Sequence, residues 1–181
     1  PIVNGTVVGI YHCTVGWQTY SYSIKGGWSN PLATLNPGDG AFISTPIGGT
    51  FTFVGNPATP QPVSVPAGQC CFLSSQVYPS TPDGFHDVTS LLPSECNVLA
   101  KPNPAGGWSP NSPVTPPFYT LYTYANGNWS PSTPTVAAGE SVVVCNYQNC
   151  HSYTQDCVMS QSLAGGHFTN AVPMVKAEIG R

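Results

Sequence analysis

The chain has 181 residues, only 6% of them charged, and a formal net charge of −3 at neutral pH. Four Lys and Arg residues are too few for the basic patch that nucleic-acid binding requires, which excludes that class of partner. No apolar run approaches the length of a membrane span. So few charges also leave little electrostatic protection against self-association.

The composition is rich in turn-forming residues, with 19 Gly and 20 Pro. Apolar residues make up 40% of the chain and aromatic residues 11%, so there is enough side-chain surface to bury. A turn-rich all-β chain therefore fits better than a disordered one. We expect one β-rich unit over residues 1–181. A chain that begins at Pro1 without Met also suggests that a signal peptide has been removed, which predicts an extracellular or cell-surface location.

The N-terminal segment, residues 2–11, reads IVNGTVVGIY and is expected to form a strand. An edge strand exposes N–H and C=O groups that a strand from another molecule can satisfy. We predict that this segment, or else residues 171–181, pairs with the sheet of a neighbouring subunit. The alternative is pairing within its own sheet. The apolar residues of these assembly strands are Ile2, Val3, Val7, Val8, Ile10, Val172 and Met174.

One phrase is written twice, as YSYSIKGGWSNPLATLNPGDG from Tyr20 and as YTYANGNWSPSTPTVAAGES from Tyr122. Aligning Trp28 with Trp129 gives ungapped agreement downstream, and one inserted residue aligns the tyrosines upstream. Alternating tyrosines, a Gly- or Asn-containing turn and a proline-bearing bridge predict a strand, a tight turn and a second strand. A short fragment of a third copy, GGWSP, occupies residues 106–110.

We therefore predict two equivalent pseudo-repeats, at about residues 10–60 and 97–145, with Trp28 and Trp129 in matching places. Residues 61–96 connect them, and residues 146–181 form a Cys-rich tail. The expected fold is all-β, with two degenerate strand-turn-strand units in a sandwich- or barrel-like body stapled by disulfides. Asp39 and Glu140 share one repeat position, which predicts that each bonds the backbone of its turn.

Further elements are expected between and after the repeats. Residues 50–55, 61–68 and 71–77 alternate as strands. The only helical candidate is Asp87 to Leu92, with Thr89 or Ser90 near its start. Residues 171–179 read AVPMVKAEI and are extended, and Pro173 restricts that strand to an edge.

The chain has seven cysteines, an odd number that leaves at least one without an intrachain partner. With almost no Lys, this content suggests an oxidising setting and disulfides. Cys70 and Cys71 are adjacent and point to opposite faces of a strand, so each should find a separate partner, such as Cys13 or Cys96. A local disulfide is expected among Cys145, Cys150 and Cys157. The full set of disulfide candidates is Cys13, Cys70, Cys71, Cys96, Cys145, Cys150 and Cys157.

The run CNYQNCH is a longer variant of the C-x-x-C-H haem attachment signal, and it makes Cys145, Cys150 and His151 haem candidates. The competing interpretation is a short disulfide-bonded loop beside a surface histidine. His12–Cys13 and Cys150–His151 together supply a tetrahedral set of metal ligands, but their spacing is not that of a compact zinc module. We predict no metal and no cofactor.

Trp28, Trp108 and Trp129 are candidates for stacking against a glycan, and the alternative is that each covers the edge of a small core. Catalytic residues are not predicted, because G-x-S-x-G is absent. The one acid-base cluster, around Asp83, His86 and Asp87, lies in a Pro- and Gly-rich loop where solvation is the expected role. The sequence therefore does not predict an enzyme.

The runs WSPSTPTVAAGES, LNPGDGAFISTP and FTFVGNP…VSVPAGQCCFLSSQV resemble tandem repeats of large secreted bacterial surface proteins. The resemblance covers about residues 10–145 and implies a β-rich secreted module without implying any chemistry. This chain departs from the pattern where Ser141, Val142 and Val143 replace an aromatic end, and in its Cys-rich tail.

These observations predict a secreted structural protein that assembles with copies of itself into a filament, surface layer or matrix. Two alternatives remain open at this point. One is a glycan-binding β module, and the other is a single-haem protein that uses the C-x4-C-H motif.

Overall fold

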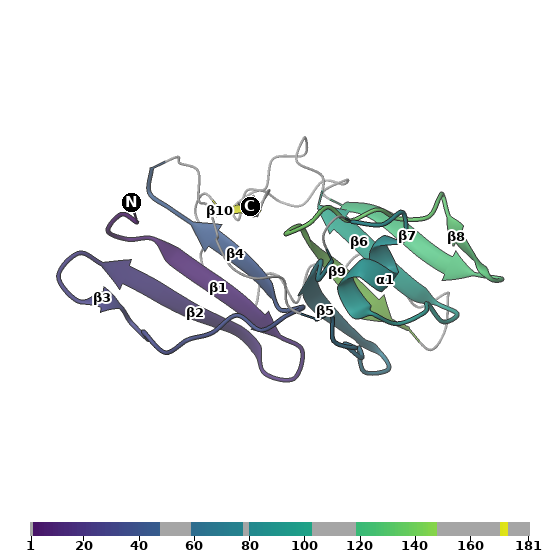
Figure 1. The fold of residues 1–181 in the computed structure, drawn as a ribbon, viewed down its shortest axis with the longest axis horizontal. Helices are drawn as coiled ribbons and strands as arrows, with labels where there is room; N and C mark the ends of the chain where they lie inside the picture. The colour runs from purple at the N-terminus through teal and green to yellow at the C-terminus, as the bar shows by residue number, and fades with distance from the viewer. Residues whose placement is uncertain (1, 48–58, 78–79, 103–118, 148–170, 174–181) are drawn as a thin grey trace.

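The computed structural model describes residues 2–47, 59–77, 80–102, 119–147 and 171–173. This part of the chain is mostly β, as predicted, with two antiparallel sheets and one short helix (Figure 1). The first sheet contains, in spatial order, β10 (Ala171–Pro173), β4 (Gly40–Ser44), β1 (Val7–His12), β2 (Gly16–Ser23) and β3 (Gly27–Trp28). The second contains β5 (Gln69–Ser74), β9 (Ser141–Asn146), β6 (Asn97–Pro102), β7 (Tyr119–Ala125) and β8 (Asn128–Ser130). The helix α1 spans Gly84–Thr89.

The two repeats have the same topology, β4-β1-β2-β3 in one and β9-β6-β7-β8 in the other. Their registers also agree. Val8 of β1 lies between Tyr20 of β2 and Ile43 of β4. Leu99 of β6 lies between the corresponding residues of β7 and β9. The predicted equivalence of residues 20–44 and 122–145 is confirmed.

The hairpin of each repeat carries the same aromatic pair. Tyr22 lies opposite Trp28, with ring centroids 5.4 Å apart in an edge-to-face arrangement. Tyr124 lies opposite Trp129 in the same way, at 5.2 Å. Both tryptophans are half-buried. The repeated Y-x-Y…W pattern therefore encodes a cross-strand contact that stabilises each hairpin.

Each repeat also closes its long bridge with the predicted acid. The Asp39 carboxylate accepts a hydrogen bond of 3.0 Å from the backbone N–H of Asn36. The Glu140 carboxylate accepts one of 2.9 Å from the N–H of Ala137. Each acid bonds the backbone three residues before it, so these acids hold turns rather than forming a reactive pair.

The structural repeat begins earlier than the sequence indicates. The N–H of Gly5 donates to the Tyr22 carbonyl at 2.9 Å, and the N–H of Cys96 donates to the Tyr124 carbonyl at the same distance. Gly5 and Cys96 both have a positive φ, of 83° and 66°. A backbone conformation is shared here although the side chains differ, which is why the sequence comparison did not detect it.

An aromatic cluster joins the two sheets, which lie side by side in Figure 1. Phe42 of β4 stacks on Phe72 of β5 at 4.5 Å, and Trp17 of β2 stacks on Phe42 at 5.2 Å. A Cβ at Gly40 would lie 2.5 Å from the Phe72 carbonyl oxygen. Gly40 therefore permits the close approach of β4 to β5 on which this cluster depends.

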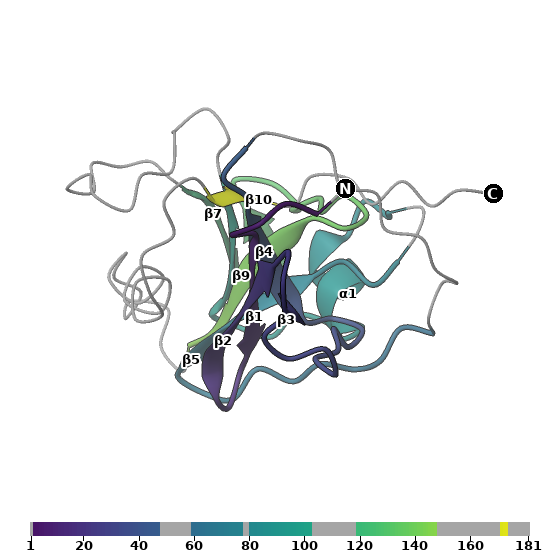
Figure 2. The same cartoon turned by 90° about the vertical axis from the view of Figure 1, so that its left-hand side faces the viewer.

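The helix lies earlier than predicted. It spans residues 84–89 rather than 87–92, because the Asp83 side chain accepts a hydrogen bond from the His86 N–H at 3.1 Å and caps its start. Ser90 then ends it with a left-handed φ of 54°. The helix lies to one side of the sheets (Figure 2).

The strand predicted for residues 61–68 is wrong. This segment makes no ladder, since its prolines remove backbone donors, and it ends in a turn at Gly68, whose φ is 74°. It is instead held at separate points, such as the 2.8 Å bond from the Val63 N–H to the Thr89 carbonyl. The strand predicted for residues 50–55 lies outside the described residues.

We predict that Gly84→Ala lowers the free energy of unfolding by about 1–3 kcal/mol, because a methyl group there overpacks a closed contact. A Cβ at Gly84 would lie 2.7 Å from the Val136 backbone nitrogen. Gly26→Ala is the control, since a Cβ there meets only the Ser23 hydroxyl at 3.1 Å. Urea denaturation of both variants is the measurement, and equal midpoints would contradict the prediction.

Candidate strand-exchange site

The outer edge of the first sheet is completed by the C-terminal strand. β10 pairs antiparallel with β4, and Ala171 lies opposite Ser44 while Pro173 lies opposite Phe42. β10 occupies the edge of the sheet order, as predicted from Pro173, which has no N–H to donate to a further strand. The first repeat therefore depends on a strand that follows the second repeat in sequence.

The second sheet is completed in the same way by the strand that follows the first repeat. β5 pairs with β9, and Cys70 lies opposite Cys145. Because Cys145 corresponds to Ser44 in the repeat alignment, Cys70 corresponds to Ala171. β5 and β10 thus occupy the same register on equivalent strands, and the two repeats exchange their fifth strands reciprocally.

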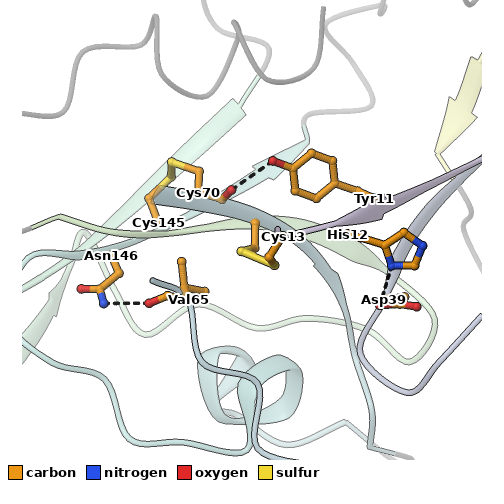
Figure 3. Close-up of a disulfide and its surroundings, with 9 residues drawn as sticks. Tyr11, His12, Cys13, Asp39, Val65, Cys70, Cys145 and Asn146 are labelled. Carbon is orange, nitrogen blue, oxygen red and sulfur yellow. Dashed lines mark hydrogen bonds and ion pairs between the residues drawn. A yellow bond between two sulfur atoms is a disulfide. The ribbon is translucent and has the colours of Figure 1, made fainter. Parts of the chain in front are cut away.

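The β5 exchange is fixed covalently at both faces of the strand (Figure 3). Cys70 forms a disulfide with Cys145 of β9, across a Cα–Cα distance of 4.0 Å. Cys71 forms a disulfide with Cys13, which follows β1 of the first repeat, across 5.1 Å. β5 is therefore bonded to both repeats. β10, by contrast, has no cysteine among its residues 171–173.

The surroundings of the disulfides are largely buried. The Tyr11 hydroxyl donates to the Cys70 carbonyl at 3.4 Å, and its burial raises the pKa of Tyr11 above its usual value. The Tyr147 hydroxyl lies 3.6 Å from the Cys70 sulfur. At the end of β9, the Asn146 side-chain amide donates to the Val65 carbonyl at 2.9 Å. These contacts fasten residues 65–71 against both β1 and β9.

The expectation that Cys70 and Cys71 find separate partners, one of them Cys13, is confirmed. Cys145 does not take part in a local pair, because β5 places Cys70 directly opposite it. Cys96 is disulfide-bonded as well. Cys150 and Cys157 lie outside the described residues. Disulfides of this kind are typical of an oxidising environment.

The N-terminal segment does not lie at a free edge. β1 is flanked by β2 and β4 of its own chain, so Val7, Val8 and Ile10 pair within the molecule. Before β1, Ile2 is 42% exposed and Val3 is partly buried. Within one chain both ladders of β1 are therefore satisfied, as in the alternative of pairing within its own sheet, and exchange of this segment with a neighbouring subunit stays a prediction. The other predicted segment, residues 171–181, supplies β10, with Val172 opposite Ile43. Met174 lies outside the described residues.

One of the three glycan-stacking candidates, Trp129, packs against the buried core. Trp28 lies edge-to-face on Tyr22, and Trp129 contacts both Tyr124 and Phe85 of α1, the latter at 5.6 Å. Trp108 lies outside the described residues. Trp28 also lines an apolar cavity of about 310 Å³ on the first sheet.

Two of the cysteines considered as haem or metal ligands are bonded in disulfides instead. The Cys145 sulfur is bonded to Cys70 and the Cys13 sulfur to Cys71, so neither is available for a thioether or a metal. Cys150 and His151 lie outside the described residues. His12 lies 3.8 Å from the Asp39 carboxylate. Within the described ranges, no group of three His, Cys, Asp or Glu residues gathers as a metal site.

The acidic residues between positions 83 and 95 each have their own hydrogen-bond partners. Asp83 caps α1, while buried Asp87 accepts 2.7 Å hydrogen bonds from the N–H and the hydroxyl of Thr81. Glu95 accepts from the N–H groups of Asn126 and Gly127 at 3.0 and 3.1 Å. Each of these carboxylates therefore accepts a hydrogen bond from at least one backbone N–H group.

Comparisons of this chain with protein-family models, with curated proteins and with solved structures found no match. In the part of the chain that the structure describes, no helix has the length and apolar character needed to cross a membrane.

We predict that Cys70→Ala/Cys145→Ala, which removes one disulfide without leaving a free thiol, lowers the free energy of unfolding by about 2–4 kcal/mol. The bond closes 75 residues of chain, and its loss enlarges the unfolded ensemble. Cys13→Ala/Cys71→Ala is the matched variant, with a separation of 58. Urea denaturation measures both, and an unchanged midpoint in either would show that the bond does not constrain the fold.

Proposed function

We propose that this protein is a secreted structural subunit that assembles with copies of itself by exchanging its C-terminal strand. In the assembled form, β10 of one copy pairs with β4 of the next. The product is an extracellular filament, surface layer or matrix.

The observation that carries this proposal is the shared register of β10 on β4 and β5 on β9. Exchange of a fifth strand already unites the two repeats. The same backbone bonds form whether β10 comes from the same chain or from a neighbour, so transfer costs little in pairing energy. A chain whose strand is given away has a β4 edge that accepts the strand of another copy, and the process repeats.

Two further features support exchange between chains. Residues 147–170 separate β9 from β10, and these 24 residues span at most roughly 80–86 Å when fully extended, enough to reach a neighbouring molecule. The near-absence of charge, 6% of all residues, removes the repulsion that separates most monomers. Because no disulfide partner exists within β10, its exchange remains reversible, whereas that of β5 is fixed.

A covalent trap tests the exchange directly. Ser44→Cys/Ala171→Cys places a cysteine pair where the second sheet has Cys70 and Cys145. We expect assembled material to give, on a non-reducing denaturing gel, a ladder in multiples of the 19.0 kDa chain. Each single substitution is a control for crosslinks through other cysteines, and the ladder should be absent from both.

Cross-linking confined to single chains would refute strand exchange, provided that electron microscopy shows assemblies in the same sample. Dispersed single particles of the native protein at high concentration would refute self-assembly itself.

A pair of truncations gives an independent prediction. A chain ending at Asn170 lacks β10, and we expect it to fold but to lose assembly, because no strand remains to donate. A chain ending at Pro173 keeps β10 and should assemble. Circular dichroism checks the fold and sedimentation velocity measures assembly. Equal assembly by the two chains would contradict the proposal.

A further inference from the structure

The first repeat contains an apolar cavity of about 310 Å³, between the sheet and the bridge that follows β3. We call this cavity the groove and define it by six of its lining residues, Val8, Tyr20, Trp28, Leu35, Ala41 and Ile43. The volume lies at the lower end of small ligand pockets, which are roughly 300–1,000 Å³. Leu35 is 48% exposed, although it is a large apolar side chain.

The corresponding face of the second repeat is closed. The counterparts of Val8, Leu35, Ala41 and Ile43 are fully buried, each with a relative exposure of 0%, and they are Leu99, Val136, Val142 and Val144. What covers them is α1. Phe85 packs against Trp129, the counterpart of Trp28, and both Phe85 and Val88 belong to the same buried cluster.

The start of α1 also bonds the bridge of the second repeat. The Gly84 N–H donates to the Pro134 carbonyl at 2.7 Å, and the absence of a side chain lets this backbone approach Val136 closely. In the first repeat, Ala33 takes the place of Pro134, and its carbonyl belongs to the bridge that lines the groove. Among the described residues, no helix lies on this face of the first sheet.

We infer that the groove of the first repeat binds a helical turn from another polypeptide, with the chemistry of α1. That turn carries an acidic cap, a glycine, a phenylalanine directly after it and a β-branched residue three positions later. The residues that define the groove are apolar or aromatic although the groove is open. The equivalent face of the second repeat, which has a similar lining, is covered by α1.

A glycan fits this groove less well. Sugars need several polar partners around an aromatic platform. Of the side chains that line the cavity, only those of Asn30, Tyr20 and Trp28 carry polar atoms, and the Tyr20 hydroxyl already donates to Gln18 at 2.6 Å. The rest of the lining is hydrocarbon. An apolar side chain such as phenylalanine matches it better.

The probe is a synthetic peptide of residues 80–91, capped at both ends. Its stabilising bonds are internal, because Asp83 caps the turn and Asp87 bonds Thr81 within the same segment. Titrated into the ¹⁵N-labelled full-length protein, it should give saturable shifts at amides of the groove, those of Val8, Leu35 and Ile43 among them. A peptide with Phe85→Ala should bind about tenfold more weakly or worse.

Two protein variants locate the binding. Leu35→Lys places a charge in the groove at an exposed position and should weaken peptide binding by about tenfold or more. Leu32→Lys is the control, because Leu32 is 85% exposed on the same bridge and does not line the cavity. It should leave binding unchanged.

Several outcomes would overturn the inference. These are no saturable shifts, shifts away from the groove, equal binding of the Phe85→Ala peptide, or groove shifts with a soluble oligosaccharide but not with the peptide. Binding that survives Leu35→Lys would do the same. None of these results depends on assembly, so the inference and the proposed function fail separately.

Discussion

The pairing of β5 with β9 is the interaction on which the rest of this molecule depends. A strand that follows the first repeat in sequence completes the sheet of the second, and two disulfides bond it to both. Its Phe72 then forms the aromatic contact between the sheets. β5 therefore carries two disulfides and a ring contact that link the two repeats. Duplication alone gives two similar units, whereas exchange makes them one body.

The same arrangement explains why equivalent faces of the two repeats differ in burial. The segment between β5 and β6 brings α1 onto the second repeat, where Leu99 and Val136 become fully buried. The equivalent face of the first repeat keeps an apolar lining around Trp28 and Leu35 without that cover. The turn-closing acids and the hairpin aromatics remain the same in both. The two repeats therefore differ mainly in the elements that pack onto each sheet, which are the added edge strand, β5 or β10, and the helix α1 on one face.

What could be predicted from the sequence was local. The hairpins could be predicted because Tyr22 and Trp28 flank a short turn that contains Gly. The roles of Asp39 and Glu140 could be predicted because these acids occupy the same position in the two repeats. The register of β5 could not be predicted, because Cys70 bonds a cysteine 75 residues away. The sequence offers several possible disulfide partners for each of the adjacent cysteines, Cys70 and Cys71. The start of α1 was missed because periodicity is weak in six residues, and the cap Asp83 was read as part of a solvated loop. The equivalence of Gly5 with Cys96 lies in backbone angles that their side chains do not reveal.

The pairing of Ser44 with Ala171 has a consequence for biosynthesis. A chain is made from its N-terminus, and domains begin to fold as they emerge. β1 to β4 can form their ladder early, but the outer edge of β4 waits until residues 45–170 have been made and β10 follows them. Throughout that interval the nascent chain displays an open sheet edge on a strand, Gly40–Ser44, that carries no charge. The order of synthesis thus makes β4 the last of the described strands to be satisfied, and this interval is when a premature partner would meet it.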